Sequence, residues 1–302
     1  ELIKRSGCLS VVTDESTDSQ DQYVLHILFV LQGLNGEDAS DSKLKVVPAD
    51  TIYLYTVNYN TISQAIIKCL NKFGVDFNNI SAFISDNATC MSKAYNQVRQ
   101  GLLPNSVDLT CNAHIVALAS DIWRANFPEV DKVQLNLITR YGQELVDLIK
   151  WFESCEIRVH QAYNKVVDLI NTYEALKDEQ HSGDAGIQNK CIKTFTEVVD
   201  KLTSYYDPDS SERTSCFTQP AHRFLKAFDP LQVCTLNLDT IPLDFIPGFN
   251  RSCKTELNCY WFHASECNSE LSLTAFWRST ETCFPNIANL AKRYLSVVPN
   301  SV

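Results

Sequence analysis

The stretch that decides the fold is CLSVVTDESTDSQDQYVLHILFV, residues 8–30. Residues 9–13 are apolar and rich in β-branched side chains, which favours a strand, and residues 22–32 form a second and longer run of the same kind. Between the two runs, residues 14–18 hold two aspartates and a glutamate. Charge at the tip of a buried strand is costly unless it has a partner, so these acids are the first candidate functional residues.

Strands and helices alternate after this pair of strands. Residues 43–50 predict a third strand that Pro48 closes, so the first three strands favour an antiparallel meander. A helical stripe follows over residues 60–73 and ends at Gly74. The pattern then predicts a strand at 80–86, a helix at 88–100, a strand at 106–111 and a helix at 113–123. This order predicts an α/β fold with a mixed five-stranded sheet and flanking helices.

The pattern changes after Pro128. Residues 130–180 and 187–206 have helical periodicity with few strand signals, and a polar loop separates them. A Pro-rich connector at 238–250 precedes a last amphipathic helix at 286–298. We therefore expect the first part of an α/β core over 1–127, a mainly α-helical insertion over 128–265, and a return to the core over 266–302.

Composition narrows the classes of function. The 302 residues carry 26 Lys and Arg against 36 Asp and Glu, a formal net charge of −10, which argues against a main surface that grips a polyanion. No window holds 18 uncharged apolar residues, so we expect no membrane span. The 12 cysteines lack repeated CxxC pairs, which favours a reduced cytosolic or nuclear interior. Because position 1 is not Met and the chain stops after LSVVPNSV, we expect a fragment or an excised domain.

Asp14 and Asp86 are candidate metal ligands, because each stands where a predicted strand ends. If the two strands lie side by side, both carboxylates share one edge of the sheet, where they suit Mg²⁺ or Mn²⁺. Two such ions about 4 Å apart can clamp the attacking and leaving oxygens of a phosphodiester. The alternative is structural, since Asp and Asn favour turns and helix N-caps, and SDNAT precedes a helix. Glu15 and Asp18 fit a solvated turn, and Asp18 also fits a position behind the metal ligands.

Taken together, several segments resemble the hAT transposase superfamily. They are VVTDESTD with the apolar YVLHILFVL after it, FNNISAFISDNATCMSKAY, LTCNAHIVALASDIW, ESCEIRVHQAYNKVVDLINTYEALK and the tail FWRSTETCFPNIANLAKRYLSVVPNSV. They follow one another in the family's order over nearly the whole chain. The resemblance implies an RNase H-like core interrupted by a helical insertion, metal-dependent DNA cleavage and transfer, a nuclear location, and a homo-oligomer formed through the C-terminal region.

The resemblance assigns roles only where positions match. Asp14 and Asp86 match two catalytic aspartates, which in the family hold metal ions together with a glutamate. Cys111 and His114 match the family's CxxH motif; taken alone, these two residues equally fit a buried thiol beside a satisfied imidazole. Arg158 matches the arginine of an Arg-Trp pair in the insertion domain and is therefore the candidate DNA-binding residue.

Two departures from the family weigh against cleavage by this chain. Val159 stands where the family has the tryptophan that stacks on an exposed base, a contact worth about 1–3 kcal/mol. The catalytic glutamate is expected a few residues after the segment that VVPNSV matches, which is beyond Val302. With two carboxylates of three, we expect weak metal binding and poor cleavage. The family also finds DNA through an N-terminal zinc finger, so we expect DNA to bind through segments outside this chain.

A second cluster of possible ligands, CKTELNCYWFHASEC, contains Cys253, Cys259, His263 and Cys267. The last three are spaced four residues apart, so on a helix they share one face and suit a zinc ion. The same spacing suits core packing, and both interpretations stay open. Nucleophilic catalysis has little support, because GxSxG and HExxH motifs and Gly-rich phosphate loops are missing from the sequence. Three further histidines have no partner at the sequence level: His160, His181 and His222.

Two classes of function follow. The first is a transposase-derived phosphoryl-transfer domain that uses Asp14 and Asp86. The second is a protein that dimerises and acts on chromatin or protein partners without cutting DNA, and the acidic balance slightly favours it. The tail carries an apolar stripe that serves either as an interface or, as the spacing favours, as internal core. The stripe comprises Phe276, Trp277, Phe284, Ile287, Leu290, Ala291, Tyr294 and Leu295.

Overall fold

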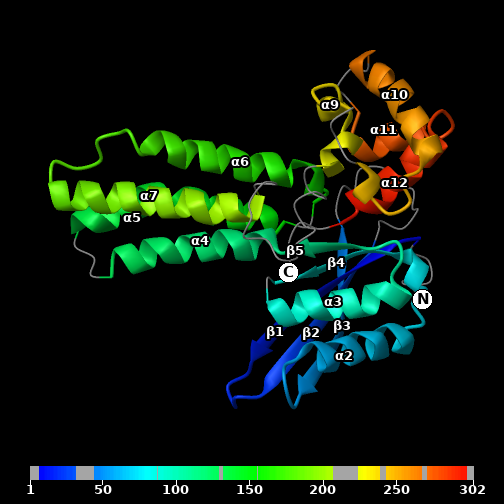
Figure 1. Ribbon diagram of the computed structural model, residues 1–302, viewed down its shortest axis with the longest axis horizontal. Helices are drawn as coiled ribbons and strands as arrows, with labels where there is room; N and C mark the ends of the chain where they lie inside the picture. Colours follow the sequence, from blue (N-terminus) through cyan, green and yellow to red (C-terminus); the bar gives the residue numbers. More distant parts are fainter. Residues whose placement is uncertain are drawn as a thin grey trace.

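The computed structural model describes residues 7–31, 44–86, 88–128, 132–154, 156–206, 224–238, 243–266 and 271–297. It is a mixed α/β structure with a five-stranded sheet in the order β3-β2-β1-β4-β5 (Figure 1). The strands are β1 (Leu9–Thr17), β2 (Tyr23–Leu31), β3 (Lys45–Leu54), β4 (Ile80–Ser85) and β5 (Val107–Thr110). β2 is antiparallel to β1 and β3, whereas β4 is parallel to β1 and β5. The predicted α/β class with a mixed five-stranded sheet is confirmed.

β1 is longer than its apolar part. The sequence predicted an end at Thr13, but the strand continues through the acids to Thr17, because β2 pairs with it as far as Tyr23. On its other side β1 pairs with β4 only as far as Val12. Asp14 is therefore paired with β2 on one side. On the other side it lies past the last residue of β1 that pairs with β4.

Pro48 does not close the third strand, contrary to the prediction. β3 runs on to Leu54, and Pro48 lies opposite Leu28, where the register between β2 and β3 shifts. Proline lacks an N–H group, so in sheets it is tolerated on edge strands and at bulges. β3 is an edge strand, and the irregularity at Pro48 lets the strand continue past it.

Helices α2 (Tyr59–Lys72) and α3 (Thr89–Leu102) cover one face of the sheet (Figure 1). Asn58 begins α2 with a capping box that it shares with Thr61, and Gly74, with a φ of 61°, follows its end. Between these helices and the sheet lies a cluster that we call the α2–α3 core. It includes Leu9, Val11, Leu25, Ile27, Phe29, Ile62, Ile66, Leu70, Phe83, Met91 and Tyr95.

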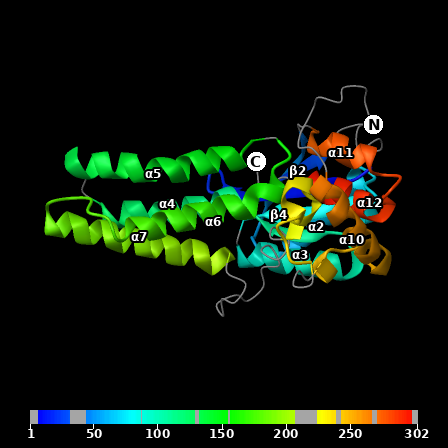
Figure 2. The same ribbon diagram turned by 90° about the horizontal axis from the view of Figure 1, so that it is seen from above.

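Helices α4 (Asn112–Asn126), α5 (Lys132–Phe152), α6 (Val159–Leu176) and α7 (Ala185–Tyr206) run side by side as a bundle. The bundle extends to one side of the sheet (Figures 1 and 2). Aromatic rings fill its centre: the ring centroid of Phe195 lies 5.7 Å from that of Trp123 and 5.3 Å from that of Tyr141. The helical character predicted for residues 130–180 and 187–206 is thus present.

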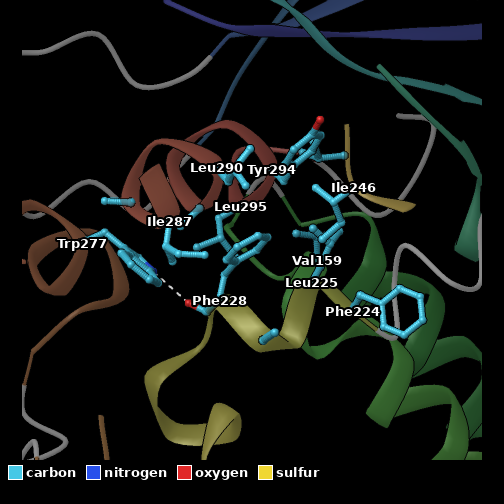
Figure 3. Packing of buried hydrophobic residues seen from close by; sticks show 14 of the residues in the cluster. Val159, Phe224, Leu225, Phe228, Ile246, Trp277, Ile287, Leu290, Tyr294 and Leu295 are labelled. Atoms are coloured by element: carbon cyan, nitrogen blue, oxygen red, sulfur yellow. Dashed lines mark hydrogen bonds between the residues drawn. The ribbon is translucent and has the colours of Figure 1, made fainter. Parts of the chain in front are cut away.

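The opposite face of the sheet is covered by C-terminal elements. They are η2 (Lys226–Phe228), α9 (Pro230–Val233), η3 (Leu243–Phe245), α10 (Arg251–Glu266), α11 (Leu273–Ser279) and α12 (Pro285–Leu295). Their apolar side chains meet Val12, Ile84 and Leu109 of the sheet in a cluster that we call the α12 core. Figure 3 shows its centre, where the indole N–H of Trp277 donates to the backbone oxygen of Phe228 over 2.8 Å.

The apolar stripe of the tail is part of this α12 core. Ile287, Leu290, Tyr294 and Leu295 are buried within the chain itself (Figure 3). The interpretation of the stripe as internal core is therefore the correct one of the two, and these side chains are not free to form an interface between subunits.

Apolar contacts join segments that are far apart in the sequence. α4 shares its apolar side chains with α5 and α7, and residues 224–264 share theirs with residues 276–297 and the sheet. The division of the chain at residues 128 and 266 stays a prediction. In the described parts of the chain, every helix is too short or too polar to cross a membrane.

Candidate metal centre

Asp14 and Asp86 each follow the last shared pair of two neighbouring parallel strands. That pair joins Val12 of β1 to Ile84 of β4, and each aspartate lies two residues further along. Side chains two residues apart on a strand point to the same face of the sheet. Because Val12 packs in the α12 core, strand alternation directs Asp14 to that side, whereas Asp86 lies one residue past the end of β4, where alternation no longer sets the direction of a side chain. The expected adjacency of the two strands is present in the sheet.

The electrostatics of Asp14 indicate that Asp86 is near. Burial, followed by the negative charge of Asp86, raises the pKa of Asp14, whereas His114 and His26 act in the opposite sense. Burial, Asp86 and Asp14 also raise the pKa of Glu15. Within the described ranges, no hydrogen bond or ion pair reaches the Asp14 carboxylate. A half-buried carboxylate beside a second one is a ready ligand for a cation.

The neighbouring acids have structural contacts as well. Oδ1 of Asp86 accepts a hydrogen bond from the backbone N–H of Ala88 over 3.2 Å, which turns the chain toward α3. One oxygen of Asp86 therefore has the turn and capping role that the sequence SDNAT also allowed. Oδ1 of Asp18 accepts from the backbone N–H groups of Gln20 and Gln22, so Asp18 is a turn residue.

Cys111 joins the sheet to the bundle. Its N–H donates to the backbone oxygen of Ser85 over 2.8 Å, and its Sγ caps α4 by accepting from the backbone N–H of His114. The thiol is buried in the bundle, but the imidazole of His114 is exposed. Since His114 also acts electrostatically on Asp14, this motif brings the start of α4 to the acidic edge.

Arg158 is engaged in contacts within the chain. Its guanidinium donates to Glu156 over 2.5 and 2.9 Å, to the backbone oxygen of Trp151 over 3.3 Å, and lies 5.0 Å from the Trp151 ring centroid. Val159, at the position of the family's tryptophan, is fully buried in the α12 core (Figure 3). These contacts give Arg158 a structural role at the start of α6.

The possible zinc ligands of α10 point in different directions. Cys253 is buried and Cys259 is exposed, while Cys267 lies outside the described residues. His263 packs its ring 5.6 Å from the ring of Phe284. Across all the described residues, no three His, Cys, Asp or Glu side chains are arranged to hold a metal ion. The binding of Mg²⁺ or Mn²⁺ stays a prediction, and the zinc interpretation of α10 stays open.

Sequence reasoning missed two histidine contacts. His26 lies directly opposite Asp14 in the β1–β2 pair, a position that only the strand register reveals. His160 lies 3.6 Å from Asp229, with both side chains buried; burial lowers the pKa of His160, and Asp229 opposes this shift. In both contacts the two partners are far apart in the sequence, so no local sequence pattern predicts them. His181 bonds to the hydroxyl of Tyr141, and His222 lies outside the described residues.

No protein-family model matches the chain, and no curated protein matches it. The function must therefore be argued from the chemistry of the site and not from a family assignment. Asp14 of β1 and Asp86, one residue past β4, lie where the pairing of these two strands ends, and His26 and His114 act electrostatically on Asp14. Carboxylate oxygens are the ligands that a hard cation takes, although among the described residues no third His, Cys, Asp or Glu completes a metal-holding group with them.

Proposed function

We propose that the chain is a transposase-derived domain of the hAT type, whose ancestral reaction is metal-dependent cleavage and transfer of DNA strands. The single observation that carries this proposal is the parallel pairing of β1 with β4, with Asp14 and Asp86 each two residues past the last pair. Ligands of open α/β sheets bind outside the carboxyl ends of the parallel strands. Asp86 directly follows β4, and Asp14 lies within β1 but past the end of its pairing with β4.

The sheet supports an RNase H-like assignment of the fold. Its order is β3-β2-β1-β4-β5, and β2 is the strand that runs against its neighbours. This is the order expected of the fold that the resemblance implies. The bundle of α4 to α7 supports the helical insertion, because it forms a separate packing unit after β5.

Mg²⁺ or Mn²⁺ fits the donors that are present. Both ions take carboxylate oxygens, and Asp14 offers a carboxylate without a hydrogen-bond partner among the described residues. A cation there would relieve the repulsion by which Asp86 raises the pKa of Asp14. When bound, the metal would activate water and stabilise charge that develops on a phosphodiester. The chain itself would orient the two carboxylates through the rigid pairing of β1 and β4.

The proposal is tested by nicking of DNA that carries terminal inverted repeats. We expect slow nicking in the presence of Mn²⁺, its loss on addition of a chelator, and its loss in Asp86→Ala. Asp147→Ala, which removes an exposed carboxylate on α5, is the matched control and should nick as the wild type does. Equal nicking by the wild type and by Asp86→Ala would remove Asp86 from the mechanism.

Two observations favour a second candidate, a nuclear protein that acts with DNA, chromatin or protein partners without cutting. The formal net charge is −10, and the matched arginine, Arg158, is paired with Glu156 inside the chain. Such a protein would reach DNA through segments outside residues 1–302 and would form a homo-oligomer through surfaces other than the buried stripe of α12. Metal-independent association of the chain with itself, without any nicking, would favour this candidate.

A further inference from the structure

A set of polar side chains joins the helical bundle to the C-terminal segments. We call it the α6–α9 seam, and it consists of His160 and Asn164 of α6, Lys226 of η2, and Asp229 and Gln232 of α9 and its N-cap. Nε2 of Gln232 donates to Oδ2 of Asp229 over 2.7 Å, and Oε1 of Gln232 accepts from Nδ2 of Asn164 over 3.0 Å. Nζ of Lys226 donates to Oδ1 of Asn164 over 3.4 Å. Side chains from two distant parts of the sequence thus form one connected polar contact.

The seam lies where α6 passes from one apolar core to the other. Val159, the first residue of α6, packs in the α12 core together with Leu225 and Phe228 (Figure 3). Further along the same helix, Ala162 and Val166 pack among the apolar side chains of the bundle. The polar contacts of the seam therefore connect two parts of the molecule that are packed separately.

His160 is the buried member of the seam and has one unsatisfied nitrogen. Its side chain is 6% exposed and that of Asp229 is 8% exposed, with Nε2 of His160 3.6 Å from Oδ2 of Asp229. The carboxylate favours the ring proton on Nε2, whereas Nδ1 is buried without a hydrogen-bond partner in the described parts of the chain. A second proton would sit on Nδ1 with no acceptor, in the first turn of α6, where the helix dipole disfavours positive charge.

The charges around His160 act in both directions. Burial lowers the pKa of His160, and the negative charge of Asp229 opposes this shift without cancelling it. Further charged side chains of the neighbouring segments have other partners or face solvent: Lys226 on η2, Arg158 and Glu156 before α6, Lys165 further along α6, and Lys150 and Glu153 near the end of α5. The closed seam therefore favours the neutral imidazole at neutral pH.

We propose that the α6–α9 seam is a pH-sensitive contact, which stays closed while His160 is neutral and opens when His160 takes up a proton, so that α6 separates from η2 and α9. Opening gives Nδ1 access to water, which can accept the hydrogen bond that the closed seam cannot. This inference concerns the attachment of the bundle to the C-terminal segments, and it needs neither a metal nor the proposed reaction.

The sign of the pH dependence follows from the direction of the shift. The pKa of His160 in the closed seam lies below the ordinary 6.5, which the ring regains once water reaches it. The contribution of His160 to the closed seam is therefore complete above pH 6.5 and is lost as the pH falls from 6.5 toward the lowered pKa. For one proton, the ratio of open to closed seam rises by up to about tenfold per pH unit in that window.

The test is hydrogen exchange at about pH 8 and about pH 5, corrected for the change in the intrinsic exchange rate. In the wild type, the amides of η2, α9 and the first turns of α6 should lose protection at the lower pH, while those of β1 and β2 keep theirs. His160→Leu cannot titrate and should show equal protection of the seam at both pH values. His263→Gln removes an exposed histidine of α10 and is the matched control, which should lose protection as the wild type does.

A second variant keeps the test decisive if His160→Leu does not fold. Asp229→Asn retains a side-chain oxygen that can accept from the N–H of Leu231 and so cap α9, but it removes the charge that favours the protonated ring. It should match the wild type at about pH 8 and open more than the wild type at about pH 5. Identical protection of Asp229→Asn and the wild type at both pH values would refute the role of the pair.

Two further results would overturn the proposal. One is equal protection of the wild-type seam at both pH values, and the other is a His160→Leu variant whose seam loses protection with falling pH as the wild type does. A nitrogen-detected NMR titration gives an independent check, since the imidazole of His160 in the intact chain should titrate below 6.5. Titration at or above 6.5 would contradict the account.

Discussion

At the scale of residues, the fold brings two carboxylates of the candidate site close enough to repel each other. Asp14 is half-buried, is close enough to Asp86 to be affected by its charge, and has no hydrogen-bond partner in the described parts of the chain. Ordinary surface aspartates avoid all three conditions, because ionised carboxylates are stabilised by water, donors or cations. Such an arrangement costs stability, and a bound cation would offset that cost.

Asp14→Asn should therefore stabilise the metal-free protein at neutral pH. A folded-state pKa raised above the ordinary 3.8 means that the protonated carboxyl group favours folding. Its contribution is complete below pH 3.8 and is lost as the pH rises through the folded-state pKa. We expect the melting temperature of Asp14→Asn to exceed that of the wild type by about 1–2 °C at pH 7 in a chelator, with the difference shrinking toward pH 3. A lower melting temperature for Asp14→Asn at pH 7 would contradict this account.

The residues of the site differ in how far the sequence predicts them. Asp14 and Asp86 follow from local pattern, since each ends an apolar run. His26 could not be predicted in the same way, because its neighbours across the sheet are set by the turn at Asp18, which determines the register of the whole β1–β2 pair. Arg158 matched a motif in sequence, but its contacts depend on Glu156 and on a tryptophan seven residues earlier.

At the scale of elements, α12 holds the C-terminal segments against the sheet. It contacts β4 and buries Ile287 and Leu290 in the α12 core. Pro285 begins the helix, and the next two backbone N–H groups, those of Asn286 and Ile287, each donate to Glu256 of α10 over 2.9 Å. A carboxylate at a helix N-terminus satisfies unpaired donors and interacts favourably with the helix dipole. Glu256 thus connects two helices that are distant in sequence.

Glu256→Ala should lower the free energy of unfolding by about 1–2 kcal/mol, the size of a lost helix cap. The loss is measurable as a shift in the midpoint of urea unfolding. Glu266→Ala removes the same side chain from an exposed position at the end of α10 and should change the midpoint very little. Equal effects of the two substitutions would show that Glu256 does not cap α12.

Element boundaries show where sequence patterns fall short. The helix after Asn58 has its cap, its apolar stripe and its terminal glycine in the local sequence, and its ends agree with the prediction. The end of β3 differs from the prediction. An edge strand tolerates Pro48, whereas a central strand would not. The local sequence does not show that β3 is an edge strand, because the order of strands depends on the whole sheet.

At the scale of the whole molecule, the bundle and the sheet have separate apolar cores. The bundle core joins residues 111–206, while the α12 core joins the sheet to residues 224–297 and to Val159 at the start of α6 (Figures 1 and 2). The backbone bond from Cys111 to Ser85 lies at their junction. Because the cores are distinct, damage to one should affect local stability more than the stability of the other.

Phe195→Ala should weaken the bundle first. Phe195 is fully buried among aromatic rings, so its loss should cost about 3–5 kcal/mol in that unit. In hydrogen exchange, the amides of α4 to α7 should lose more protection than those of β1 and β2. Phe262→Ala, at an exposed position of α10, is the control and should leave protection unchanged. A uniform loss over the whole chain in Phe195→Ala would mean that the molecule unfolds as a single unit.

The central claim, that Asp14 and Asp86 face one ion, is tested most directly by anomalous diffraction from crystals that contain Mn²⁺. The account predicts a peak at the carboxyl edge of β1 and β4, about 2.1 Å from a carboxylate oxygen of each aspartate, on the side of the sheet that carries the α12 core. Side chains turned to opposite faces of the sheet, or a map with peaks only elsewhere on the protein, would contradict it.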